Sequence, residues 1–157
     1  MTKTAFDSPA RACLPCAMQP DVFRHPYRVT YADCTTGNHV YYARYLDFLE
    51  AARNEFFRTL GCPFLEWQDQ GIAFPVIECR LRYRSPARYD DLLSLEIWPT
   101  QAEGIRLDFA YCIRKSAGPL ILEAETLHVC TGSHEKPKRL PGELCNRLQP
   151  FLRSAAR

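Results

Sequence analysis

The side chains best suited to acid–base chemistry lie close together in one short polar stretch. Asp33 and Thr35 come just before His39, among small and turn-forming residues. An unperturbed imidazole titrates at about pH 6.5, which suits a general base, and a carboxylate can hold a water molecule. The hydroxyl of Thr35 can position water but cannot readily deprotonate it near neutral pH. These three residues are therefore candidate catalytic groups.

Each of these residues also has a purely structural interpretation. Asp33 can form an Asx-turn or a helix cap, Thr35 can simply close the turn, and His39 can be an exposed residue beside a helix start. Glu50 follows roughly three helical turns after His39, near the same side of the expected helix. It is a fourth catalytic candidate, as an acid of the site or of a neighbouring subunit. Its alternatives are a buried polar partner and a solvated side chain.

A long helix is expected directly after this stretch. Apolar residues recur there at intervals of three and four, and Gly61 supplies an end. Backbone N–H groups at a helix start lack intrahelical partners and carry partial positive charge. Those of residues 38–42 could therefore stabilise a developing oxyanion. The apolar positions are Tyr42, Tyr45, Leu46, Leu49, Ala52, Phe56 and Leu60.

The other segments predict an antiparallel sheet. Their apolar and polar residues alternate, and the links between successive segments are short, which favours antiparallel neighbours. The fold class is therefore α+β: a five-stranded antiparallel sheet wrapped around one long central helix, with Arg and Glu positions on its outer face. The expected strands cover residues 27–31, 76–84, 93–98, 105–114 and 120–130, and a last short helix is expected within 141–152.

Composition predicts an ordinary single domain. The chain has 157 residues, 46% hydrophobic and 24% charged, with a net charge of +2. That charge gives no basic field for nucleic acid, and no apolar run is long enough to span a membrane. A cytoplasmic protein without nucleic-acid or membrane partners is expected. Residues 1–22 contain several prolines and no periodicity, so they are expected to be a flexible extension of a domain at 23–157.

Eight cysteines are spread along the chain. Several lie in strand-like runs, where a free thiol packs as a small hydrophobic group. Cys13 and Cys16 have the spacing of half a zinc site or of a redox pair, but no second such pair follows. No metal site is therefore expected.

Two stretches resemble a known family. Residues 31–45, Tyr-Ala-Asp-Cys-Thr-Thr-Gly-Asn-His-Val-Tyr-Tyr-Ala-Arg-Tyr, resemble the signature of the 4-hydroxybenzoyl-CoA thioesterase-like family. Residues 83–93 are similar to that family's loop between its second and third strands. The resemblance implies the hotdog fold for about residues 23–151. The chain departs from the family at Thr35, where the usual catalytic residue is Asp, and at Asn38, where a Gly is usual. The second change is mild because Asn tolerates left-handed backbone.

The resemblance implies an acyl-CoA thioesterase that hydrolyses a small or medium acyl-CoA and needs no cofactor. With Thr35 at the usual Asp position, His39 becomes the expected base, with Asp33 as its partner or as an acceptor for water. Arg84 and Arg88 could meet the phosphates of coenzyme A, or could be solvated strand ends. The residues expected to contact the substrate at the helix start are Asn38, Val40, Tyr41 and Tyr42.

Two other functions stay open at this stage. A hotdog dehydratase or hydratase would act on a hydroxyacyl or enoyl thioester with a His and an acid, although the residues around His39 do not resemble that signature. A non-catalytic acyl-thioester-binding protein is consistent with Thr35. The resemblance also implies a homodimer or a homotetramer whose active sites lie at the subunit boundary.

Overall fold

The computed structural model describes residues 22–116 and 118–154. Residues 1–21 of the expected extension, including Cys13 and Cys16, lie outside the described residues. Val22 is described, and it is buried in a small apolar cluster with Trp98. It therefore belongs to the folded domain rather than to the extension.

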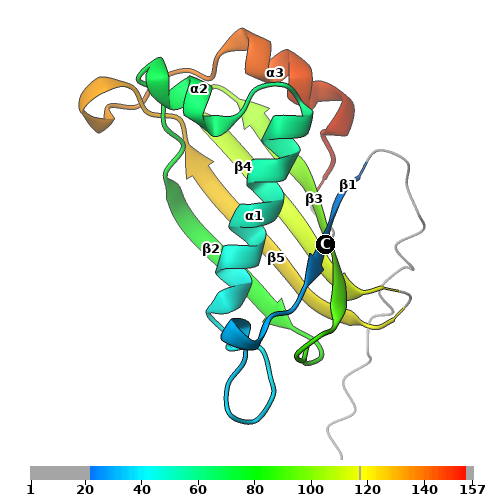
Figure 1. Ribbon diagram of the computed structural model, residues 1–157. Helices are drawn as coiled ribbons and strands as arrows, with labels where there is room; N and C mark the ends of the chain where they lie inside the picture. The colour runs from blue at the N-terminus through cyan, green and yellow to red at the C-terminus, as the bar shows by residue number, and fades with distance from the viewer. Residues whose placement is uncertain (1–21, 117, 155–157) are drawn as a thin grey trace, which may run out of the picture.

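Five strands form one antiparallel sheet in the order β1-β3-β4-β5-β2 (Figure 1). The pairing of consecutive strands β3, β4 and β5 follows from the short links between them. The expected five-stranded antiparallel sheet is confirmed. The strands are β1 (Phe23–Arg28), β2 (Val76–Tyr83), β3 (Leu92–Glu103), β4 (Arg106–Lys115) and β5 (Leu120–Val129).

Two strand boundaries differ from the expectation. β1 ends at Arg28 instead of continuing to residue 31, because the chain turns into the short 3-10 helix η1 (Tyr31–Asp33). β3 continues to Glu103, five residues beyond the expected strand end at residue 98. A register shift between Pro99 and Gln101 lets the strand continue past a proline, which has no N–H to donate to the ladder.

The helix α1 (Arg44–Thr59) lies across the inner face of the sheet, as expected, and packs against β1 and β3 (Figure 1). It begins two residues later than Tyr42, the first apolar position of its periodic pattern. Its end follows the expectation, because Gly61 takes a left-handed backbone with φ 69° and donates its N–H to the Arg58 carbonyl at 2.9 Å.

Short helices cover one end of the sheet (Figure 1). The expected last helix is present as α3 (Gly142–Leu148) followed by η3 (Gln149–Phe151). Another short helix, α2 (Phe64–Asp69), was not expected, because a six-residue helix is too short for a periodic pattern to stand out. It buries Trp67 in the main core. A 3-10 turn, η2 (Ser133–Glu135), completes the elements.

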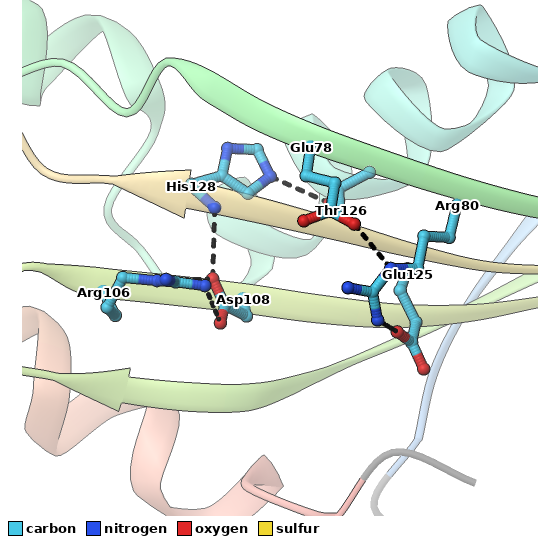
Figure 2. Close-up of polar contacts among 7 residues, drawn as sticks. All are labelled: Glu78, Arg80, Arg106, Asp108, Glu125, Thr126 and His128. Carbon is cyan, nitrogen blue, oxygen red and sulfur yellow. Dashed lines mark hydrogen bonds and ion pairs between the residues drawn. The ribbon is translucent and has the colours of Figure 1, made fainter. Parts of the chain in front are cut away.

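The outer face of the sheet carries the expected alternation of arginine with acidic residues. Arg80 lies beside Glu78 and Glu125, and Arg106 lies beside Asp108 (Figure 2). The face is not uniformly polar, because Trp98, Ala110 and Cys112 are buried in the cluster that includes Val22.

The two edges of the sheet differ. β1 contains Pro26, which limits pairing with a further strand, whereas β2 contains no proline. β2 is exposed at almost every residue, while central β4 is buried along most of its length. Within the described residues β2 pairs only with β5, so its other edge is open.

Candidate active site

The polar stretch before α1 forms a closed loop. Cys34 and Val40 face each other in an isolated β-bridge. Thr35 donates its N–H to the His39 carbonyl at 2.8 Å, and Asn38 donates to the Thr35 carbonyl at 3.0 Å. Asn38 has φ 54°, which confirms the left-handed backbone expected for this position. The loop is therefore held by its own backbone before the helix begins.

Asp33 is buried and acts as a cap. Its Oδ2 accepts hydrogen bonds from the Thr30 N–H at 2.7 Å, the Thr30 hydroxyl at 2.7 Å and the Tyr27 hydroxyl at 3.0 Å. Burial and the Asp33 carboxylate together raise the pKa of Tyr27 to about 12, so this hydroxyl stays protonated as a donor. These contacts support the capping interpretation of Asp33 that the sequence left open.

The structure does not bring Asp33 and His39 together as a base and its partner. The Asp33 carboxylate is occupied by Thr30 and Tyr27, and the His39 ring hydrogen-bonds to no group of the described residues. Thr35 donates its hydroxyl to the His39 carbonyl at 3.2 Å, so its side chain closes the loop. The described residues therefore show no hydrogen bond between Asp33 and His39, and the His39 side chain is exposed.

The amides free to bind an oxyanion are not all those expected. The N–H of Val40 donates to the Ala87 carbonyl at 2.9 Å, and that of Tyr41 donates to the Asp33 carbonyl at 2.9 Å. Within the described residues, the N–H groups of Tyr42 and Ala43 have no acceptor. Of the amides expected at residues 38–42, those of Asn38, Val40 and Tyr41 are engaged, whereas Tyr42 and the following Ala43 keep free N–H groups because α1 begins only at Arg44.

Exposed tyrosines surround this helix start. The rings of Tyr41 and Tyr42 lie 4.6 Å apart, and the hydroxyl of Tyr83 on β2 donates to the Tyr42 carbonyl at 2.9 Å. Asn38 accepts a hydrogen bond from the Tyr89 N–H at 3.1 Å, which fastens the loop to the β2–β3 connection. The aromatic groups therefore lie at the surface, where a ligand can contact them.

The two arginines expected to meet coenzyme A phosphates differ. Arg84 makes two hydrogen bonds to Glu123 Oε2, at 2.8 and 2.6 Å, on the outer face. The exposed Arg88 side chain makes no ion pair with any described residue, while its backbone N–H donates to Asp91 at 2.7 Å. Arg88 is therefore free to bind a phosphate, whereas Arg84 would first have to break its hydrogen bonds to the Glu123 carboxylate.

A chain of polar side chains that sequence reasoning missed runs between α1 and the sheet. Arg53 of α1 donates to the Tyr111 hydroxyl at 2.9 Å, and that hydroxyl lies 3.0 Å from Thr126 Oγ1. Thr126 lies 2.8 Å from His128 Nε2 (Figure 2), and His128 Nδ1 lies 3.0 Å from the Phe74 carbonyl. The sequence feature that could have indicated these hydrogen-bonded side chains was the presence of two polar residues, Thr126 and His128, at inward positions of an otherwise apolar strand.

The direction of the hydrogen bonds from Arg53 to Phe74 follows from the last group in the series, the Phe74 carbonyl. A carbonyl can only accept, so His128 Nδ1 carries a proton and donates to Phe74. Burial lowers the pKa of His128 to about 4, so the ring is neutral and Nε2 accepts from the Thr126 hydroxyl. Thr126 then accepts from Tyr111, whose oxygen accepts from Arg53. Every donor thus points from Arg53 toward Phe74.

Comparison with known proteins places this geometry in a family. The model of the thioesterase-like superfamily matches residues 29–148, well over half of the chain. The chain belongs to the thioesterase-like superfamily. Its match with that family includes the loop, α1, all strands after it and all of α3.

Individual members of the thioesterase-like superfamily agree. The acyl-CoA thioester hydrolase YbgC of Escherichia coli O6:H1 is 36% identical, over 79% of this chain and 93% of that protein. The acyl-CoA thioesterase YbgC of Haemophilus influenzae is 35% identical, over 78% of this chain and 90% of its own. A solved 1,4-dihydroxy-2-naphthoyl-CoA thioesterase from Synechocystis has a TM-score of 0.77 at 23% identity, over 82% of this chain and 96% of that one.

The likeness to the Synechocystis structure concerns the fold, and it confirms the expected hotdog fold. The expectation of an acyl-CoA thioester hydrolase is confirmed by the YbgC relatives and the family match. In this thioesterase-like chain, Thr35 stands at the position where an Asp is usual, and the Asp33 Oδ2 atom is engaged as a cap.

Glu50 is the remaining catalytic candidate in this thioesterase-like chain. It is exposed on α1 and makes no ion pair with any described residue. It shares a side of α1 with Leu46, one turn before it, and Arg53, one turn after it. The structure does not bring Glu50 to His39, since the two side chains make no contact through hydrogen bonds or charges among the described residues.

A hollow of about 360 Å³ lies at the far end of α1 from the loop. It is lined by Asn54 and Arg58 of α1 and by residues 63–66 and Asp69 around α2. None of the expected site residues of the thioesterase-like chain lines it. Across residues 22–116 and 118–154, no group of three His, Cys, Asp or Glu side chains converges as a metal site would require.

Proposed function

We propose that this protein hydrolyses small or medium acyl-CoAs with the free amides of Tyr42 and Ala43 as its oxyanion site. Water attacks the thioester carbonyl, the carbon–sulfur bond breaks, and the products are a carboxylic acid and coenzyme A with a free thiol. Negative charge grows on the carbonyl oxygen during the attack, and two preorganised N–H donors at a helix start stabilise it. The unpaired amides before α1 are the observation that supports this site.

His39 is the group we propose to take the proton from water. Its ring is exposed on the loop that leads to Tyr42, and no described residue occupies either nitrogen. Thr35 is engaged with the His39 carbonyl, and Asp33 is engaged as a cap. Among the four expected catalytic residues, His39 and the exposed Glu50 are thus the ones free to act on a substrate.

We also propose that a second copy of the chain completes the site. The open edge of β2 can pair with the β2 of that copy, which would extend the sheet across both subunits. Exposed apolar residues, Val76 and Ile77 on β2 and Leu46 on α1, would then be covered. The resulting assembly is a homodimer, or a homotetramer built from two of them.

The proposed location is the cytoplasm. All six described cysteines are free, and a reducing compartment keeps thiols in this state. No helix of the described residues is long and apolar enough to cross a membrane. Substrate binding in this proposal draws on Arg88 for the coenzyme A phosphates and on Tyr41 and Tyr42 for the thioester end.

The test is release of free thiol from a panel of acyl-CoAs, followed with a thiol-reactive dye. His39→Ala is expected to lower kcat at least about tenfold, because general-base catalysis typically contributes a hundredfold or more. The far-ultraviolet circular dichroism should be unchanged, since the exposed ring holds no described residue in place.

His134→Asn is the matched control. His134 is another exposed histidine, and its φ of 59° suits Asn, so this change should leave kcat unaltered. If His39→Ala leaves kcat unchanged and Glu50→Gln is inactive, the general base is Glu50 rather than His39. A protein that binds acyl-CoA but releases no thiol from any member of the panel would be a binding protein, and the proposed hydrolysis would be refuted.

A further inference from the structure

Arg53 is a half-buried cation without an anionic partner. Its guanidinium donates to the Tyr111 hydroxyl, and no carboxylate of the described residues lies within ion-pair distance of it. Arg82, Arg88 and Arg139 also lack such a partner, but they are exposed, so water solvates them. A guanidinium has five N–H donors, and withdrawing it from water is costly unless its charge is matched. Arg53 therefore stands out as a cation with donors to spare.

The groups around Arg53 do not supply a negative charge. Burial lowers the pKa of His128 and raises that of Tyr111, so both are uncharged at neutral pH. Burial also raises the pKa of the nearby Cys79 thiol, which stays protonated. Asp108 is taken by Arg106 (Figure 2). The positive charge of Arg53 is thus left without compensation on the inner side of the sheet.

The polar chain behind Arg53 fixes its position. Each hydroxyl in the chain donates to the next member, and the last donor bonds a backbone carbonyl. Asp108 Oδ1 also accepts the backbone N–H of His128 at 3.1 Å (Figure 2). A fold needs only apolar side chains at these inward positions, and a fully satisfied polar chain in their place holds one guanidinium in one orientation.

We propose that Arg53 binds a carboxylate on the distal part of the acyl group, so that the preferred substrates are ω-carboxyacyl-CoAs. Arg matches a carboxylate with two parallel N–H···O bonds, which gives both charge compensation and direction. This inference rests on the proposed function, because the thioester must be held at the amides of Tyr42 and Ala43.

The acyl group would reach Arg53 of the opposite subunit. Ala43 and Arg53 of one copy are about 15 Å apart along the helix axis at 1.5 Å per residue, too far for a short acyl chain. Tyr83 contacts Tyr42 at the start of α1, while Cys79 interacts with Arg53. Two β2 strands related by a two-fold axis run antiparallel, so the helix start of the second copy lies toward the Cys79 and Val76 end of the first. Arg53 of the first copy therefore lies toward the thioester that is bound at the helix start of the second copy.

The experiment compares acyl-CoAs of equal length with and without a terminal carboxylate. Glutaryl-CoA is paired with pentanoyl-CoA, and adipoyl-CoA with hexanoyl-CoA. The unsubstituted protein is expected to show at least a tenfold higher kcat/KM for a carboxylated member of one pair. Arg53→Gln should remove that preference while changing kcat/KM for the plain acyl-CoA less than threefold. Arg53→Lys, which keeps the charge and loses the bidentate geometry, should retain part of the preference.

Arg58→Gln is the matched control, because Arg58 lies on the same helix and pairs with Glu55. It should leave the preference intact. Equal kcat/KM within both pairs, or equal losses for both members in Arg53→Gln, would overturn the inference. If no acyl-CoA is hydrolysed, the proposed function fails. In that case, calorimetric measurement of glutaryl-CoA and pentanoyl-CoA binding tests the carboxylate site independently of hydrolysis. A tenfold lower Kd for glutaryl-CoA that Arg53→Gln abolishes would support the site. Equal Kd values would refute it.

Discussion

At the scale of single residues, the side chains whose types suggest catalysis are not always the ones that are free to contact a substrate. Asp33 has the right type and place for catalysis, yet it caps a turn. His128 looks like core packing, yet it belongs to a polar chain that ends at Arg53. What decides each role is the set of hydrogen-bond partners, because a carboxylate that already accepts three hydrogen bonds is a poor base for water.

His128 should make folding stability depend on pH. Its pKa is about 4 in the folded protein against an ordinary 6.5, so the unfolded chain takes up a proton first as the pH falls. The stability from His128 is complete above about pH 7 and is lost as the pH falls toward 4, by roughly 3 kcal/mol in all. Urea unfolding from pH 7 to 4 should show this loss, and His128→Gln, with one donor and one acceptor, should show less of it.

Carboxylates titrate over the same pH range, so the informative quantity is the difference between the two proteins. That difference in free energy of unfolding should shrink steadily below pH 6.5. Exposed His134→Asn is the control and should follow the unsubstituted protein throughout. Parallel curves for His128→Gln and the unsubstituted protein would contradict a neutral buried imidazole.

At the scale of elements, η1 and the closed loop decide where α1 begins. The helix begins at Arg44 instead of at the expected Tyr42, because backbone hydrogen bonds hold Val40 to Ala87 and Tyr41 to Asp33. This delay leaves the amides of Tyr42 and Ala43 free at the loop's end. The position of an oxyanion site can therefore depend on a short cap more than on the helix itself.

Asp33→Ala tests the role of that cap. It removes the acceptor of three hydrogen bonds from Thr30 and Tyr27, so the free energy of unfolding should fall by about 2 kcal/mol. Asp47→Ala is the control, because Asp47 is exposed and its ion-pair partner among the described residues is Arg44, and the change should cost less than about 1 kcal/mol. Chemical denaturation measures both. Equal losses would argue against a special capping role for Asp33.

At the scale of the whole molecule, the sheet has one protected edge and one open edge. β1 carries Pro26, while β2 is exposed and carries the exposed apolar residues Val76 and Ile77. A domain of this size gains most from covering such an edge with an identical edge. In the proposed dimer, the amides of Tyr42 and Ala43 of one subunit and Arg53 of the other would form one site.

Ile77→Lys should separate the subunits. Ile77 is 55% exposed on β2, so a lysine there does not disturb the described core, but it places two charges at the proposed interface. Sedimentation at micromolar concentration should show a smaller species than the unsubstituted protein, with reduced thiol release. Leu65→Lys is the matched control, since Leu65 is 66% exposed on α2 rather than on β2, and the assembly of this variant should be unchanged. A stable, active monomer of the unsubstituted protein would refute the shared site.

The sequence by itself determined the long helix, the five strands and the family. Periodicity and turn residues predicted the helix, the five strands and the end at Gly61, because these depend on residues close together in the chain. Only the tertiary structure decided which groups are free, because Val40 meets Ala87, Arg84 meets Glu123 and Arg53 meets Tyr111 across long stretches of sequence. A one-dimensional pattern shows which side of a strand a residue occupies, but not which hydrogen-bond partner lies opposite it.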